Sequence, residues 1–314
     1  MKQTAFVAAV TLVFGSLASA ADPQLMNMVM PDAKVMAGIN VEQAKTSAFG
    51  QFVLAMMPAN SGFEQFISTT GFDPRRDLHE VLIASTGDAG HKAGLILARG
   101  NFNLSGIAAA ALKEGHHTSQ TYKGVQLLTS TDGKGHEAMA LIDSNIVAAG
   151  DLDSVKAALD RRAGANSVDP QLAVRVNQLS ASEDAWSVSI APISSLMGTA
   201  NAEKGAHAQA MNVFKSIQQS SGGVKFGSVV QINGEALAAS EKDATSLGDV
   251  LKFLASMIQA NGPKNSPVPL SDLIKNLSVT TEGATLKVSL GIPEDQLETL
   301  VKAMHAHEDS GAVI

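Results

Sequence analysis

The sequence contains no cysteine, one tryptophan and one tyrosine, and only 17% of its 314 residues are charged. Without thiols the chain cannot form disulfides, thiolate zinc sites or iron–sulfur clusters, and it has no cysteine nucleophile. The thiol that a lipoprotein anchor requires is missing as well. An aromatic content of 4% disfavours a sugar-binding cleft, because such clefts use the flat faces of tryptophan and tyrosine. The formal net charge of −7 disfavours nucleic acid and anionic membrane surfaces as partners.

The first twenty residues have the pattern of a secretory signal peptide. Lys2 provides a positive charge, residues 5–17 are largely apolar, and Ala18-Ser19-Ala20 forms a small-x-small cleavage pattern. The apolar stretch is shorter than the roughly 20 residues that cross a bilayer, which disfavours a retained anchor. We therefore predict cleavage after Ala20 and a periplasmic protein, or one secreted beyond the outer membrane. The mature chain is expected to have no transmembrane segment and no lipid anchor.

A strand–turn–strand–helix pattern then occurs four times, in residues 80–115, 138–163, 228–258 and 277–306. Asn233-Gly234 and Gly283-Ala284 have the composition of hairpin turns. In the helical parts apolar residues recur at three- and four-residue spacing, which is typical of one face packed on a sheet. Strands that open at Lys34 and Trp186 begin two similar halves, the second continued by a helix over residues 202–219.

Hairpins that lead into helices predict an α+β fold with mainly antiparallel sheets, helices on one face and an internal duplication. The alternative is that a common arrangement recurs by chance. The predicted organisation is a signal peptide (1–20), a first half (21–163), a junction (164–184), a second half (185–308) and a C-terminal tail (309–314). Gly222-Gly223 is interpreted as a flexible loop. The sequence leaves open whether the halves share one sheet or form two packed domains.

The sharpest candidate for a metal site is Met26, Met28 and Met30. At alternate positions of an extended chain the three thioethers would project to one side, and soft sulfur ligands select Cu(I). The preferred interpretation is that these residues are apolar anchors of the first element, because methionine fills irregular gaps in a core. No cofactor is predicted.

Two histidine pairs and one arginine-rich segment have weaker patterns of ligand binding. His116-His117 and the pair His305 and His307 lack the three- or four-residue spacing that brings two ligands together on a helix. In Asp73-Pro74-Arg75-Arg76-Asp77, the paired guanidinium groups suit an anionic ligand. Local arginine–aspartate pairs in a solvated loop are the preferred interpretation.

Three phrases, in residues 30–52, 71–85 and 143–162, resemble exported proteins of Gram-negative bacteria that form a family of unknown function. The resemblance lies mainly in residues 29–162 and implies a compartment and a fold, without an activity or site residues.

No serine-hydrolase elbow, zinc-protease, P-loop or dinucleotide-binding motif occurs in the sequence. The leading hypothesis is therefore a non-catalytic envelope protein that binds another protein or acts as a structural module. The alternatives are a periplasmic carrier or sensor of an apolar small molecule, and a hydrolase with dispersed catalytic residues.

Overall fold

The computed structural model describes residues 21–56, 61–88, 94–113, 115–131, 137–165, 167–196, 213–261 and 268–309. The strands are β1 (Val35–Asn40), β2 (Leu78–Ser85), β3 (Gly94–Gly100), β4 (His117–Tyr122), β5 (Val125–Ser130), β6 (Glu137–Asp143), β7 (Ile146–Asp151), β8 (Ala185–Ser189), β9 (Ile217–Lys225), β10 (Val229–Ala238), β11 (Ser278–Glu282) and β12 (Thr285–Pro293). The helices are α1 (Pro23–Met28), α2 (Val41–Ala44), α3 (Ala48–Ala55), α4 (Ser61–Thr70), α5 (Pro74–Asp77), α6 (Leu104–Lys113), α7 (Leu152–Arg161), α8 (Pro170–Ser182), α9 (Ile193–Leu196), α11 (Glu241–Asn261), α12 (Leu270–Leu273) and α13 (Glu294–Asp309).

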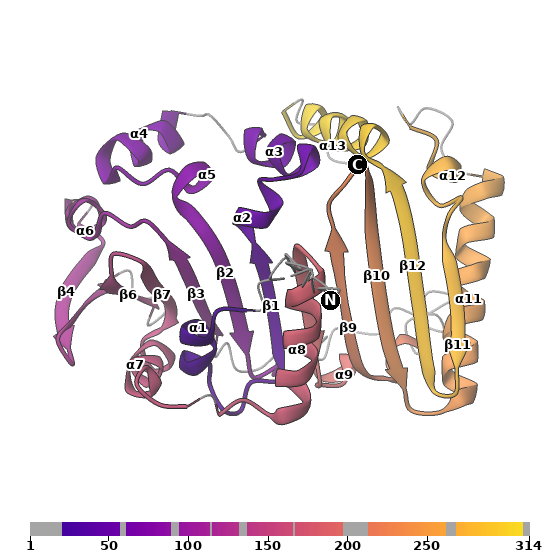
Figure 1. Ribbon diagram of the computed structural model, residues 1–314, viewed down its shortest axis with the longest axis horizontal. Helices are drawn as coiled ribbons and strands as arrows, with labels where there is room; N and C mark the ends of the chain where they lie inside the picture. The colour runs from indigo at the N-terminus through magenta and orange to yellow at the C-terminus, as the bar shows by residue number, and fades with distance from the viewer. Residues whose placement is uncertain are drawn as a thin grey trace, which may run out of the picture.

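All of these strands belong to one twelve-stranded sheet in the order β11-β12-β10-β9-β8-β1-β2-β3-β7-β6-β5-β4 (Figure 1). Every neighbouring pair is antiparallel. The predicted α+β class and antiparallel pairing are therefore confirmed. The sheet is continuous across the two halves, which meet where β1 pairs with β8.

The two halves share one strand order. The order β1-β2-β3-β7-β6 in the first half corresponds to β8-β9-β10-β12-β11 in the second, and β4 and β5 extend the first half. The helices occupy matching places in the chain, since α6 and α11 follow β3 and β10, and α7 and α13 follow β7 and β12. The halves therefore have the same topology around the β1–β8 pair.

One face of the sheet, here called the front face, carries α1, α7 and α8. In the first half this face forms the main core, where side chains of these helices pack on alternate residues of β1, β2, β3, β5, β6, β7 and β8. Leu25 and Met28 of α1, Val155 of α7 and Leu172 of α8 are fully buried there. These helices exclude water from the aliphatic residues of the strands, which is the main favourable term in folding.

The opposite, or back, face carries α6 and α11. Ala108 of α6 packs on Leu128 and Leu141, whereas Leu127 and Ala140, one residue earlier, belong to the front-face core. In the second half Leu247 of α11 packs on Leu286. Helices on one face were predicted, but the structure places them on both. The physical reason is that strands such as β5 and β6 are apolar at consecutive positions and need cover on each side.

Two dipeptides that contain glycine were wrongly interpreted from the sequence as a turn and a loop. Asn233-Gly234 lies in the middle of β10, and Gly222-Gly223 lies within β9, so neither pair makes a turn or loop. Gly222 is paired with Gly234, and a methyl group on Gly222 would lie 2.5 Å from the carbonyl oxygen of Asn233. Close approach between strands therefore requires glycine here. The helix predicted over residues 202–219 gives way to β9 from Ile217, and residues 202–212 lie outside the described part.

The predicted junction contains α8, which is a core element. The Asp169 carboxylate accepts hydrogen bonds from the backbone N–H groups of Gln171 and Leu172, and Pro170 occupies the first helical turn. The buried side of α8 carries Leu172 and Val176 and packs over β8, β1 and β9. In the part of the chain that the structure describes, no helix has the length and apolar character to cross a membrane.

Candidate functional site

A groove of about 570 Å³ runs between α8 and the front face of the second half. It exists because α8 covers β8 and β1 while the front face of β10 and β12 carries no helix in the described part of the chain. Figure 1 shows α13, the counterpart of α7, across the ends of these strands instead of over their front face. The lining of the groove includes Pro170, Gln171, Val174 and Arg175 of α8, and Val188, Gln219, Ser221, Glu235, Leu237 and Thr285 of the sheet.

The sheet register brings the floor residues together in two rows. Leu237 lies between Gln219 on β9 and Thr285 on β12, and Glu235 lies between Ser221 and Lys287. Cross-strand partners on one face of an antiparallel sheet have Cβ atoms about 4.5–5.5 Å apart. The part of the floor on β9, β10 and β12 is therefore mainly polar around Leu237, while Val188 and Ile190 add apolar groups beside β8.

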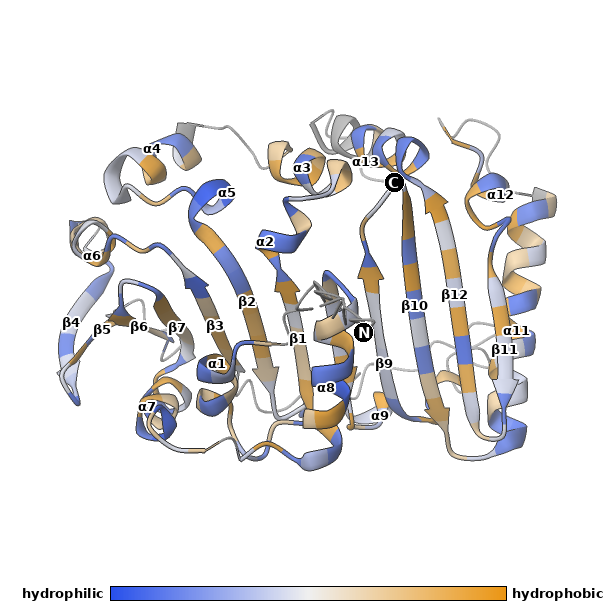
Figure 2. Ribbon diagram, viewed as in Figure 1, coloured by the Kyte–Doolittle hydropathy of each residue, from blue (hydrophilic) through white to orange (hydrophobic). Residues whose placement is uncertain are grey.

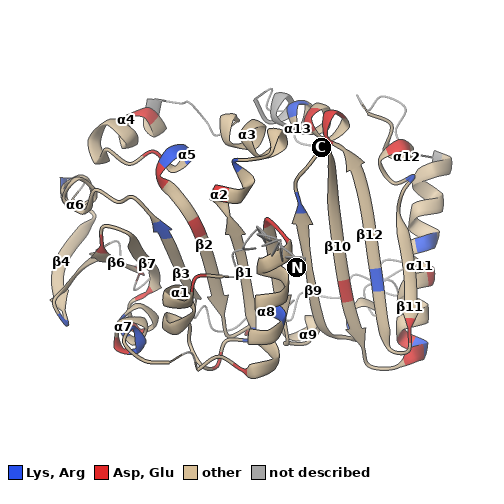
Figure 3. Ribbon diagram, viewed as in Figure 1, with Lys and Arg blue, Asp and Glu red and all other residues tan. Residues whose placement is uncertain are grey.

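Charged side chains at the groove neutralise one another. Arg175 Nη1 lies 3.2 Å from Glu235 Oε2, which joins α8 to β10. Glu235 is the cross-strand partner of Lys287, whose Nζ donates a hydrogen bond of 3.0 Å to Glu282. This hydrogen bond raises the pKa of Lys287 above its usual value, and the charge of Glu235 acts in the same direction. Positive and negative groups alternate across the face (Figure 3), so the groove has no excess charge to attract an ion.

The groups left for a ligand are uncharged. Within the described part of the chain, the side chains of Gln171, Gln219, Ser221 and Thr285 make no hydrogen bond. Amide and hydroxyl groups both donate and accept hydrogen bonds. Together with Val174, which is 55% exposed, they form a surface for an uncharged ligand with alternating donors, acceptors and small apolar groups.

The described lining does not contain the parts of a hydrolytic site. It has no histidine, and its carboxylate, Glu235, is paired with Arg175 rather than with a hydroxyl group. A serine nucleophile needs a base within hydrogen-bond reach, and Ser221 has none among these residues. Across the described residues no three His, Cys, Asp or Glu side chains are grouped closely enough to hold a metal ion.

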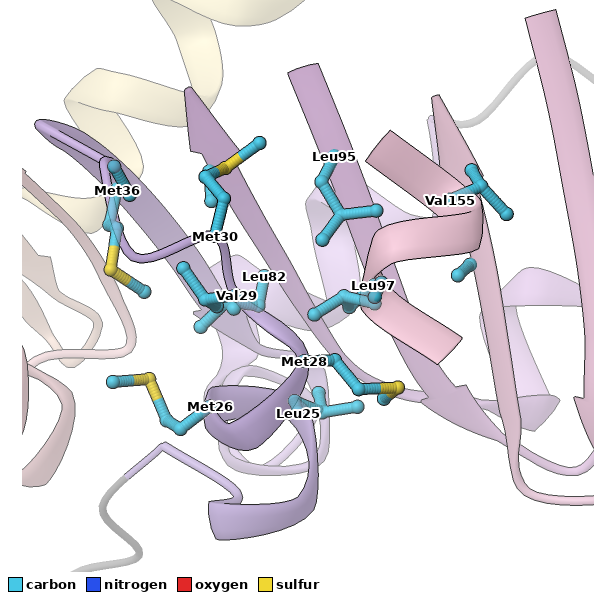
Figure 4. Packing of buried hydrophobic residues seen from close by; sticks show 14 of the residues in the cluster. Leu25, Met26, Met28, Val29, Met30, Met36, Leu82, Leu95, Leu97 and Val155 are labelled. Atoms are coloured by element: carbon cyan, nitrogen blue, oxygen red, sulfur yellow. The ribbon is translucent and has the colours of Figure 1, made fainter. Parts of the chain in front are cut away.

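Met26, Met28 and Met30 lie in the main core. Residues 23–28 form α1 rather than an extended chain, so the three side chains do not project to one side. Figure 4 shows the thioethers of Met26 and Met28 on opposite sides of α1 and that of Met30 directed elsewhere. All three side chains are buried among aliphatic residues. The structure therefore does not bring these sulfur atoms together, and it gives each of them a packing role.

The paired arginines at the start of β2 bind neighbouring carboxylates. Asp73 caps α5 and accepts two side-chain hydrogen bonds of 2.9 Å from Arg75. Arg76 likewise binds Asp77. Hydrogen bonds from these guanidinium groups lower the pKa of each aspartate. The arginine charges are therefore paired with neighbouring carboxylates, which is the preferred interpretation of the sequence.

The described histidine pair, His116-His117, lies away from the groove. His117 begins β4, at the far edge of the sheet from the second half. His305 and His307 fall on the last part of α13, where the structure does not describe side chains. The cleavage site after Ala20 also lies outside the described residues.

Sequence reasoning missed the groove residues, although a usable signal was present. On β9 and β10 the front positions read Gln219, Ser221 and Gly223, then Gln231, Asn233 and Glu235. A strand that is polar at every second position has one solvated face. Interpreting Asn233-Gly234 as a turn hid this alternation.

No protein-family model and no curated protein matches the chain. Its fold is similar to that of TP0453 in a crystal structure of that protein, with a TM-score of 0.50 and 11% sequence identity. The match covers 91% of this chain and 98% of TP0453. At this identity the similarity concerns the fold alone, and the resemblance to exported proteins of unknown function stays a prediction.

Proposed function

We propose that this protein is an exported, non-catalytic binding protein that holds an uncharged peptide segment of another envelope protein in the groove beside α8. The observation that carries the proposal is the set of unpaired amide and hydroxyl side chains, Gln171, Gln219, Ser221 and Thr285, among charges that are already paired. A peptide backbone alternates N–H and C=O groups, which such side chains can satisfy. Val174 and Leu237 provide apolar contacts for small side chains of the peptide.

The carrier alternative predicts a different lining. An acyl chain or another apolar molecule in this groove would remove Gln219, Ser221 and Thr285 from water without replacing their hydrogen bonds. Each such loss costs about 1–3 kcal/mol. These three polar side chains therefore favour a peptide, whose backbone can replace the lost hydrogen bonds, over an apolar ligand.

Two tryptophan substitutions on one strand test the proposal. Leu237→Trp places a large side chain in the groove, and Gln231→Trp places the same side chain on the same face of β10 outside the groove lining. The protein is isolated from its own envelope and measured by native mass spectrometry, and any bound species is fragmented. We expect wild type and the Gln231→Trp variant to carry a species that fragments into amino acids, and the Leu237→Trp variant to carry none.

Three results would contradict the proposal. A wild-type protein without a bound species contradicts the binding of a peptide. A bound species that fragments into acyl chains favours the apolar carrier. A bound peptide that persists in the Leu237→Trp variant places the site elsewhere on the molecule.

A further inference from the structure

The first described residues form part of the main core rather than a loose tail. Ala21 is 6% exposed, and Leu25, Met28 and Val29 are fully buried. The ends of most domains are poorly ordered unless specific contacts hold them. The contacts at Ala21 therefore show what holds this part of the chain in place.

Two polar groups hold the backbone nitrogens at this point. The nitrogen of Ala21 donates a hydrogen bond of 3.0 Å to Ser180 Oγ on α8. Ser180 is itself buried and donates to the carbonyl oxygen of Val176, so its hydroxyl oxygen is the acceptor for Ala21. The next nitrogen, of Asp22, donates a bond of 3.1 Å to Glu80 Oε1 on β2.

Glu80 is a half-buried carboxyl group whose neighbouring cation is engaged elsewhere. Its cross-strand partners are Asn40 and Arg99, and the guanidinium group of Arg99 forms an ion pair with Asp22. The Asp22 carboxylate also caps α1 through the nitrogen of Gln24. Burial raises the pKa of Glu80 to about 7. A positive charge close to Glu80 would therefore have a large effect on its ionisation.

We infer that cleavage after Ala20 provides this charge, and that the new α-ammonium group of Ala21 docks between Ser180 and the Glu80 carboxylate. The inference rests on the signal peptide predicted from the sequence and is independent of the groove. A signal peptidase adds one water molecule across the Ala20–Ala21 bond. The hydroxyl group goes to the carbonyl carbon of Ala20 and the hydrogen to the nitrogen of Ala21. Transfer of the acid proton then leaves a carboxylate on Ala20 and an ammonium group on Ala21.

The geometry limits the distance between the Ala21 nitrogen and the Glu80 carboxylate. Consecutive backbone nitrogens are at most about 4 Å apart, so the Ala21 nitrogen lies within about 7 Å of Glu80 Oε1. Opposite charges that are close and shielded from water stabilise each other's ionised form. The docked terminus would join the C-terminal end of α8 to β2. Because the other end of α8 forms a wall of the groove, the same contact helps to position that wall.

Of the other charged groups described near this site, Asp22, Arg99 and Asp184 are paired, whereas Oε2 of Glu183 is buried without a hydrogen-bond partner. Asp22 and Arg99 pair with each other. Asp184, which precedes β8, holds Lys225 at 2.8 Å. Glu183, at the end of α8, packs over Gly223 on β9. Because Oε1 of Glu80 already accepts the hydrogen bond of the next nitrogen, that of Asp22, we expect Glu80 to be the main counterion of the new terminus.

The experiment compares three N-termini on otherwise identical chains. One chain begins with a free Ala21, a second carries Gly-Ser before Ala21, and a third has an acetylated Ala21. At pH 7 we expect the melting temperature of the free-amine chain to exceed that of the other two by on the order of 5 °C. Glu80→Gln should abolish the difference, and Glu282→Gln, at an 81% exposed side chain, should leave it intact.

A second measurement tests the charge directly. In the chain labelled with ¹⁵N, NMR titration should give the α-amine of Ala21 a pKa above the usual value of about 8, and Glu80→Gln should bring it back. Equal melting temperatures for the three chains, or a difference that persists in the Glu80→Gln variant, would overturn the inference. A first residue other than Ala21 in protein isolated from the envelope would do the same.

Discussion

The front faces of the two halves differ although their strands follow the same order. In the first half, β2, β3 and β7 present aliphatic side chains such as Leu82, Leu97 and Ala148, which α1, α7 and α8 cover. In the second half, β10 and β12 present polar residues such as Asn233 and Lys287 on the same face. Figure 2 shows this change in hydropathy along the sheet. One topology thus provides a closed core in one half and an open, largely polar surface in the other.

The helix after the last central strand reflects this difference. In the first half α7 packs on the front face, with Val155 and Ala158 buried. In the second half Leu297 and Leu300 of α13 pack against a small cluster of Val268, Leu273 and Ile292. A polar strand face provides no apolar surface for a helix to bury, so the helix is stabilised elsewhere. Side chains on equivalent strands, rather than strand order, therefore determine where a site can form.

The largest expected effect comes from two leucines on the front face, one in each half. Leu97→Ala on β3 should lower the free energy of unfolding by about 2–5 kcal/mol, because Leu97 is fully buried and leaves a cavity. Leu237→Ala on β10, the equivalent strand, should cost less than about 1 kcal/mol, because Leu237 is already 38% exposed. Urea unfolding measures both. Equal losses would contradict the distinction between a closed and an open face.

Next in size is a pair of glycines that face each other across β9 and β10. Gly222→Ala should cost about 1–3 kcal/mol, because the new methyl group meets the Asn233 carbonyl oxygen at 2.5 Å. Gly234→Ala should be neutral or slightly stabilising, since no atom lies within 4 Å of its methyl position. Thermal unfolding distinguishes the two variants. A harmless Gly222→Ala would show that these strands can move apart.

The next effect is the pH dependence of stability that the buried carboxyl group of Glu80 causes. It is measured in the chain that carries Gly-Ser before Ala21. The pKa of Glu80 is raised from 4.5 to about 7, so the folded state binds more protons than the unfolded state between these values. Stability should be highest below pH 4.5 for this group and fall by about 1–2 kcal/mol as the pH rises through 7. Glu80→Gln should remove this component from a series of urea titrations between pH 5 and 8. An unchanged pH profile in that variant would assign the dependence to another group.

The smallest effect is expected at the open face. Arg175→Ala should lower the free energy of unfolding by about 0.2–1 kcal/mol, because Arg175 and Glu235 are 51% and 36% exposed and water screens their attraction. A double-mutant cycle with Glu235→Gln should give a coupling energy that decreases at high salt. A coupling energy that does not respond to salt would show that the pair is more buried than the structure indicates.

Local sequence patterns predicted much of the secondary structure. The units at β6, β7 and α7 and at β11, β12 and α13 were recognised because a short turn separates two apolar strands and a capped helix follows. The strand β9 was missed because Gln218 to Gly223 has little apolar character. The same composition marks the floor of the groove, so the least strand-like segment of the sequence was the one nearest to the candidate site.

By itself the sequence determined the α+β class, the antiparallel hairpins, the absence of disulfides and the predicted cleavage after Ala20. These depend on residues close together in the chain, or on a residue type that is missing. Only the tertiary structure decided that the halves share one sheet, that α8 and Ala21 belong to the core, and that Gln219, Ser221 and Glu235 line one groove. Contacts between distant segments depend on strand order and register, which local hydrophobic periodicity does not specify.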